Sequence, residues 1–140
     1  MPVLLKKGAK MGDRYQTDEE IATVVAGFEQ CTTGKAEFTH LSHLTVAAYY
    51  LRSSSPDETF QKMRFGLQRF LDHHCVDRAK YSDPVTWAWI EQIQSVIEQM
   101  DDDASMVAVT NRVLELLGDY RGAVEDHRRA NATQSQNRER

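Results

Sequence analysis

The residues with the clearest chemical potential in this sequence are three histidines, His40, His43 and His74. His40 and His43 are three positions apart, so on a helix they occupy neighbouring positions of one face. An imidazole near neutral pH can act as a base, an acid or a metal ligand. The same spacing joins metal ligands in helical di-iron bundles. A metal held by His40, His43 and His74 is therefore one interpretation of this pattern.

Tyr81, Ser82 and Asp83 follow soon after His74 in the chain. They fall at the expected N-terminus of a helix, where backbone N–H groups and the helix dipole favour an anionic group. A phenol or carboxylate beside an imidazole can orient it or complete a ligand set. The sequence thus predicts a histidine-lined pocket for a small molecule. Acid/base or hydrolytic chemistry stays open there, and the sequence identifies no cofactor.

Each histidine also has a purely structural interpretation. A histidine on an apolar helix face usually bonds a backbone carbonyl or a neighbouring hydroxyl in the core. The protein would then be a non-catalytic interaction protein, and two other residues become important. Trp87 and Phe65 both fall off the apolar stripes of their helices, and exposed aromatic residues mark interfaces. They predict a homodimer or a partner surface, with a tail folded back over them as the other explanation.

Helix start signals determine where these side chains can lie. Two stretches have the capping-box pattern, Thr17 to Glu20 and Ser55 to Glu58. Thr39 is a suitable N-cap, and Asp83-Pro84 combines a cap with a proline that suits the first helical position. Asp101 to Asp103 separates the last two helices. The expected helices therefore begin at Thr17, Thr39, Ser55, Asp83 and after Asp103, and the last ends near Gly118.

Apolar residues recur at helical spacing after each start signal, and no segment alternates over strand length. This predicts an all-α fold, a single antiparallel bundle of about five helices. Antiparallel packing of the second and third helices would bring His40 and His74 to the same end of the bundle. We expect a variable leader over 1–16, a helical domain over 17–127 with a short sixth piece around 120–129, and a flexible tail over 128–140.

Composition excludes several classes of function. The chain has 140 residues, 41% hydrophobic and 27% charged, which is ordinary globular composition. Its net charge is −4 and the body has no dense basic stripe, so nucleic acid is an unexpected partner. The longest apolar run, Leu44 to Leu51, is too short to span a bilayer. With only Cys31 and Cys75, both expected as buried thiols, the predicted compartment is the cytoplasm.

Three blocks of the sequence resemble a family of small bacterial helical proteins. The blocks are Phe38 to Ala47, Gly66 to Phe70 with the following His74, and Lys80-Tyr81 with Thr86 to Trp89. They are similar to a Phe-x-His-x-x-His-Leu block, a helix ending in His, and a Tyr-His-x-Thr-x-Thr-x-Ala-Trp block, over roughly residues 25 to 120. The resemblance implies one recurring constellation and no activity. Its members are His40, His43, His74, Tyr81, Thr86 and Trp89.

This chain departs from the family pattern at the third block. It has Ser82 where such proteins tend to have His, and Asp83-Pro84 where they tend to have an acid or similar residue and Thr. A metal site or catalytic pair that relied on that histidine is weakened here. The departure therefore counts against transferring an enzymatic activity by analogy.

Overall fold

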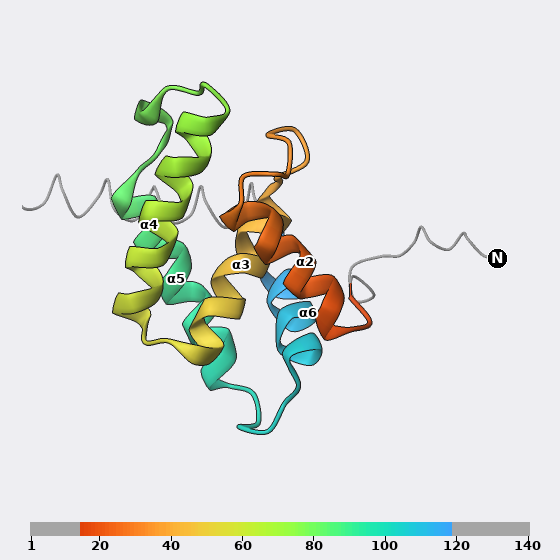
Figure 1. The fold of residues 1–140 in the computed structure, drawn as a ribbon. Coiled ribbons are helices and arrows are strands. Elements are labelled where there is room, and N and C mark those ends of the chain that lie inside the picture. The colour runs from red at the N-terminus through yellow and green to blue at the C-terminus, as the bar shows by residue number, and fades with distance from the viewer. Residues whose placement is uncertain (1–14, 119–140) are drawn as a thin grey trace, which may run out of the picture.

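The computed structural model describes residues 15–118, which form an all-helical bundle (Figure 1). Within these residues there are five α-helices and one short 3-10 helix, and no strand. The predicted all-α bundle is therefore confirmed. The expected sixth piece around 120–129, most of the leader and the tail lie outside the described residues. The elements are α2 (Asp18–Glu29), α3 (His40–Ser53), α4 (Pro56–His73), η2 (Arg78–Lys80), α5 (Asp83–Glu98) and α6 (Met106–Leu117).

The helix starts follow the capping signals closely. Thr17 and Ser55 each form a complete capping box with the glutamate three residues later, and Thr39 forms one with Ser42. The start of α5 differs from the prediction. Ser82, in extended conformation, is the N-cap and its hydroxyl accepts the Val85 N–H at 3.3 Å, so Asp83 is already the first helical residue. The positive end of the helix dipole stabilises the Asp83 carboxylate at this position.

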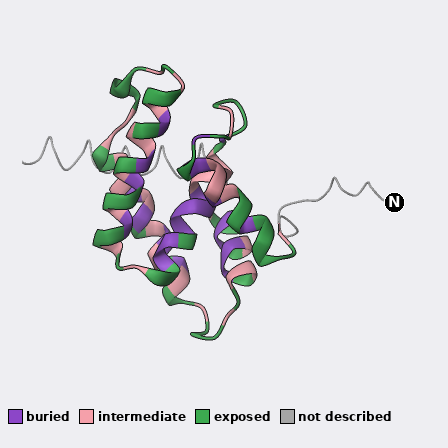
Figure 2. Ribbon diagram, viewed as in Figure 1, coloured by how far each residue is buried: buried purple, intermediate pink, exposed green. Residues whose placement is uncertain are grey.

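Helix α3 lies at the centre of the bundle and packs against α2, α4, α5 and α6 (Figures 1 and 2). Because neighbours surround it, burial is not confined to one stripe. Six consecutive residues from Leu44 to Tyr49 include only one exposed side chain, that of Tyr49. Ala47 and Ala48 are short enough to let neighbouring helices approach closely. The longest apolar run in the sequence is thus a central helix.

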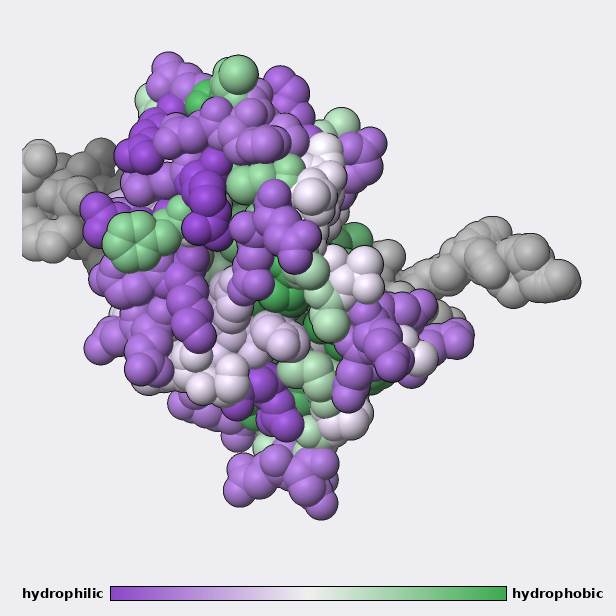
Figure 3. All heavy atoms as spheres, in the orientation of Figure 1, coloured by the Kyte–Doolittle hydropathy of each residue, from purple (hydrophilic) through white to green (hydrophobic). Residues whose placement is uncertain are grey.

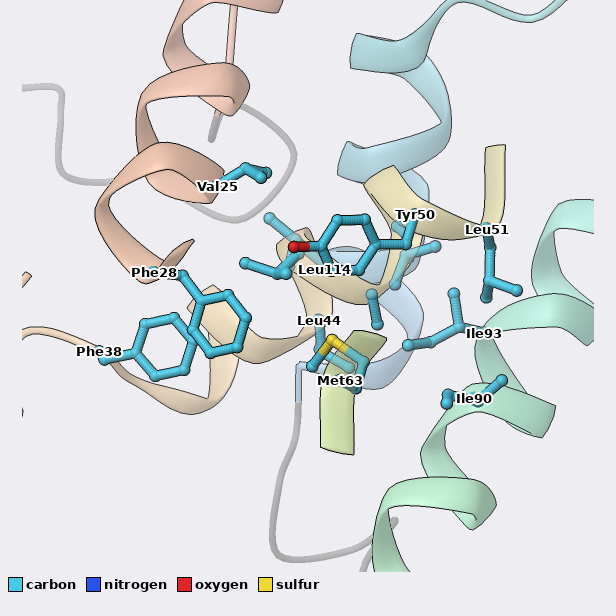
Figure 4. Close-up of a cluster of buried hydrophobic side chains, with 14 of the residues drawn as sticks. Val25, Phe28, Phe38, Leu44, Tyr50, Leu51, Met63, Ile90, Ile93 and Leu114 are labelled. Atoms are coloured by element: carbon cyan, nitrogen blue, oxygen red, sulfur yellow. The ribbon is translucent and has the colours of Figure 1, made fainter. Parts of the chain in front are cut away.

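The core is organised around aromatic rings. Phe28 of α2 is fully buried and stacks on Phe38 at 5.0 Å and on Phe70 at 6.0 Å between ring centroids. Figure 4 shows Phe28 and Phe38 side by side, and Leu44 of α3 beside Met63 of α4. Gly66 of α4 lies directly under Phe28, so the absence of a side chain at this position allows the ring to pack.

Tyr15 is part of the packed structure, although the leader was expected to run to residue 16. Its hydroxyl lies 3.0 Å from the Thr45 hydroxyl, and its backbone exchanges two hydrogen bonds with the side-chain amide of Asn111. These bonds join the chain before α2 to both α3 and α6. Among the described helices, none combines the length and the apolar character that crossing a bilayer requires.

The two cysteines occupy equivalent backbone positions. Cys31 follows the C-cap of α2 and Cys75 follows the C-cap of α4, with φ of 58° and 59°. This left-handed conformation ends helices and usually belongs to glycine. Cys31 is buried, but Cys75 is exposed, so the expectation of two buried thiols is wrong for Cys75. The physical reason is that the chain leaves the bundle beyond α4, away from the core.

Gly66→Ala is expected to destabilise the protein, although alanine is the better helix former by about 1 kcal/mol. A Cβ at position 66 would lie 2.5 Å from two ring carbons of Phe28, and that ring is held between Phe38 and Phe70. We expect the free energy of unfolding to fall by about 1–3 kcal/mol in denaturant titration. The exposed Gln61→Ala on the same helix should change it by less than about 0.5 kcal/mol. Equal effects of the two substitutions would contradict the packing described.

Cys75→Gly is expected to stabilise the protein by about 0.5–1 kcal/mol. Glycine removes the left-handed strain of roughly 1–2 kcal/mol, and its greater freedom in the unfolded chain offsets part of the gain. Cys75→Ala is the matched control, because it also removes the thiol but keeps a Cβ at φ 59°. Thermal or denaturant unfolding distinguishes the two variants. A gain of the same size in both would show that the thiol, and not the backbone conformation, is responsible.

Candidate functional site

A cavity of about 770 Å³ lies between α3, α4 and α5, and the connections 35–38 and 76–82 contribute to its wall. Its volume is within the range of small-molecule sites. Most of the lining is apolar and includes Leu44 of α3, Met63 of α4, and Ile90 and Ile93 of α5. Figure 4 shows the side chains of Ile90 and Ile93 directed from α5 toward α3. On the face seen in Figure 3, hydrophilic side chains predominate, and hydrophobic groups are visible between them in the middle of the face. Five of the six residues in the predicted constellation line this cavity, namely His40, His43, Tyr81, Thr86 and Trp89.

His43 is held by its own helix turn. Its Nδ1 lies 3.0 Å from the main-chain oxygen of Thr39, and because a carbonyl only accepts, Nδ1 carries the proton. The ring packs on Phe38, with centroids 4.5 Å apart. Burial lowers the pKa of His43, the bond to Thr39 opposes this, and nearby His40 lowers it further. A neutral ring with Nδ1 protonated leaves Nε2 as a hydrogen-bond acceptor, and His43 is one of the residues that line the cavity.

His40 is anchored across the bundle to the last turn of α6. Its Nε2 donates to the main-chain oxygen of Leu117 at 3.1 Å, and its ring packs against Trp89 of α5 at 4.8 Å. Burial lowers the pKa of His40, and the bond to Leu117 opposes that shift. The side chain therefore connects α3, α5 and α6. These contacts alone account for the position of His40 in the cavity wall, whether or not the residue also binds a ligand.

Tyr81 brings a polar group into the apolar lining. Its hydroxyl oxygen is buried and makes no hydrogen bond of ordinary geometry within residues 15–118, although the side chains of Thr86 and Asp83 lie close to it. Burial raises the pKa of Tyr81 to about 12, and Asp83 raises it further while Thr86 acts in the opposite direction. The phenol is therefore a neutral donor at physiological pH. The Thr86 hydroxyl donates to the Ser82 main-chain oxygen at 2.9 Å, so toward the phenol it can only act as an acceptor.

His74 does not line the cavity, in contrast to the expectation that three imidazoles converge. It is the C-cap of α4, and its ring lies 4.4 Å from Phe70 and 4.9 Å from His73. Phe70 in turn packs on Phe38, which packs on His43. Two phenylalanine rings thus separate His74 from His43. Antiparallel packing brings the helix ends together, as predicted, but the aromatic core fills the space between the two imidazoles.

The predicted metal site finds no ligand set. In the part of the chain that the structure describes, no three His, Cys, Asp or Glu side chains are grouped to hold a metal ion. The reason is the separation of His74 from the other two histidines and the absence of a carboxylate from the cavity wall. Ser82 also lines the cavity, and its hydroxyl accepts the Val85 N–H as the N-cap of α5.

The two aromatic residues predicted to form an interface differ from each other. Trp87 is half-buried, packs on the core and meets Phe60 of α4 edge to face at 5.4 Å. The expectation that Trp87 is left outside the core is wrong, because α4 packs alongside α5 and covers this ring. Phe65 is 63% exposed on α4, as expected for a residue off the apolar stripe. Its role in a homodimer or partner surface stays a prediction.

Sequence reasoning missed the apolar part of the cavity wall and both of its charged residues, Lys35 and Lys80. Both are exposed residues in connections and belong to no helix stripe, so periodicity could not identify them. One signal was available: Lys35 lies three residues before Phe38, and Lys80 directly precedes Tyr81. A lysine beside a site residue in a loop can reach the same site.

The chain matches no protein-family model, no curated protein and no solved structure. The resemblance to small bacterial helical proteins therefore stays a prediction.

Acidification is expected to destabilise the fold through His40 and His43. Their pKa values in the folded protein lie below the ordinary 6.5, so below about pH 6.5 the unfolded chain binds protons that the folded chain does not. The free energy of unfolding should therefore decrease as the pH falls. Denaturant titrations of wild type and His43→Gln at about pH 7 and about pH 5 check this. The variant should lose less stability between the two pH values, and an equal loss would contradict the stated cause.

Proposed function

We propose that this protein binds a small, mainly apolar molecule that carries a hydrogen-bonding group, in the cavity between α3, α4 and α5. The observation that carries the proposal is the buried hydroxyl of Tyr81, which makes no hydrogen bond of ordinary geometry with the described residues and belongs to the wall of a cavity of about 770 Å³. A buried hydroxyl without a hydrogen bond costs about 1–3 kcal/mol. A ligand with an acceptor group would recover that free energy, since the phenol keeps its proton and can donate.

The composition of the wall supports a ligand of this kind. Apolar side chains from three helices supply most of the surface, so burial of a hydrocarbon or aromatic body would drive binding at roughly 25 cal/mol per Å². A few polar groups fix orientation in such sites. Here they are the donor of Tyr81 and the neutral ring of His43, whose Nδ1 is already committed to Thr39. A ligand hydroxyl suits both, because it can accept from the phenol and donate to an imidazole nitrogen.

Titration with 1-naphthol, followed by calorimetry, tests the proposal. We expect saturable binding to the full chain, and at least a tenfold loss of affinity in Leu67→Trp, where the larger side chain fills space in the cavity wall. Phe65→Trp is the matched control, because it introduces the same residue on the same helix at an exposed position. This control should bind within about twofold of wild type, as expected of a surface substitution. Circular dichroism establishes that both variants fold.

Tyr81→Phe separates the polar contact from the shape of the cavity. Loss of one hydrogen bond of about 0.5–1.5 kcal/mol should weaken 1-naphthol binding by a few-fold, and naphthalene binding should not change. No binding of either compound to the wild type, or equal binding by Leu67→Trp and Phe65→Trp, would contradict the proposed function.

A further inference from the structure

The charged side chains in the wall of the cavity are both positive. Lys35 and Lys80 line it, and no aspartate or glutamate does. The chain as a whole has 21 acidic and 17 basic residues, with a net charge of −4. A cavity wall with two lysines and no aspartate or glutamate is therefore opposite in sign to the protein that contains it. Such a local field attracts and orients an anion.

Neither lysine is neutralised by an ion pair within residues 15–118. The ion pairs there are all formed by arginines: Arg64 with Asp83, Arg78 with Asp72, and Arg112 with Glu115. Two of these pairs matter for the cavity. Asp83, which lies close enough to raise the pKa of Tyr81, is 3.5 Å from Arg64, and Asp72 at the end of α4 is 2.9 Å from Arg78. Two carboxylates at this end of the bundle thus already have cationic partners. Glu37 and Asp77 lie in the same connections as the lysines, but neither lines the cavity.

The two lysines come from separate connections that lie at the same end of the molecule (Figure 1). Lys35 belongs to the turn between α2 and α3, and Lys80 ends η2 before α5. Both are exposed and yet line the cavity, so they lie where it opens to solvent. Deeper positions, such as Ala47, Met63 and Ile93, are apolar and buried. The cavity therefore changes from cationic at its opening to hydrocarbon inside.

We propose that the ligand is an apolar monocarboxylic acid, bound as its anion with the hydrocarbon body between α3, α4 and α5 and the carboxylate at Lys35 and Lys80. This inference rests on the proposed function and adds the charge of the ligand. A carboxylate only accepts hydrogen bonds, and the ammonium groups of both lysines and the hydroxyl of Tyr81 are donors. The body of such a molecule gains from burial, and its charged end stays in partial contact with water, so little desolvation opposes binding.

The test compares 2-naphthoate with 2-naphthamide, which have nearly the same shape and differ in charge at neutral pH. We expect calorimetry to show naphthoate binding about tenfold more tightly at low ionic strength, with the preference shrinking as salt is added. In the double variant Lys35→Gln/Lys80→Gln the two compounds should bind equally. Lys62→Gln is the matched control, since Lys62 is an exposed lysine of α4 outside the cavity wall. This control should keep the full preference.

The outcomes separate the two proposals. Equal binding of naphthoate and naphthamide to the wild type overturns the inferred charge and leaves the proposed function in place. A loss of preference in Lys62→Gln as large as in the double variant also overturns it, because the effect would then come from overall charge. Failure of both compounds, together with 1-naphthol, to bind overturns the proposed function as well.

Discussion

The packing of α3 against all four other helices is the constraint on which the rest of the structure depends. A helix surrounded in this way must bury side chains around its whole circumference, so its polar residues need partners within the bundle. Thr45 meets this need by donating to Leu41, and Tyr15 adds a contact to its hydroxyl. His40 and His43 meet it through main-chain oxygens at the start of α3 and the end of α6. The burial of α3 among its neighbours therefore also determines how the two imidazole rings are held.

The cavity lies beside α3 where the packing of neighbouring helices leaves space and one polar group of the wall has no hydrogen bond of ordinary geometry. Phe28, Phe38 and Phe70 fill the space between α2, α3 and α4, whereas on the side of α5 the ring of Trp89 packs on His40 and lines the cavity. The wall there includes Tyr81, whose hydroxyl makes no hydrogen bond of ordinary geometry with the described residues, and half-buried apolar side chains such as Leu67. An apolar space with one unsatisfied donor and a cationic opening is poorly explained as structure alone. It is well suited to a ligand that supplies an apolar body and an acceptor.

The sequence predicted most of the fold because its signals are local. Capping residues such as Thr17, Thr39 and Ser55 act within one turn, and their patterns placed three helix starts correctly. The site was predicted less well, because periodicity describes one helix at a time. It could not show that aromatic rings separate His74 from His43, or that α4 covers Trp87. Lys35 and Lys80 lie in connections and belong to no helix stripe, so helical periodicity could not predict the cationic opening of the cavity.

The most direct test of the account is a crystal structure of the full chain soaked with 4-bromo-1-naphthol, with the bromine located by its anomalous scattering. The account predicts one dominant bromine position between α3, α4 and α5, with the naphthyl ring against Trp89 and the ligand oxygen within hydrogen-bonding distance of the Tyr81 hydroxyl. Bromine only at the molecular surface, for example beside the exposed ring of Phe65, with the space between the three helices filled by protein side chains, would contradict it.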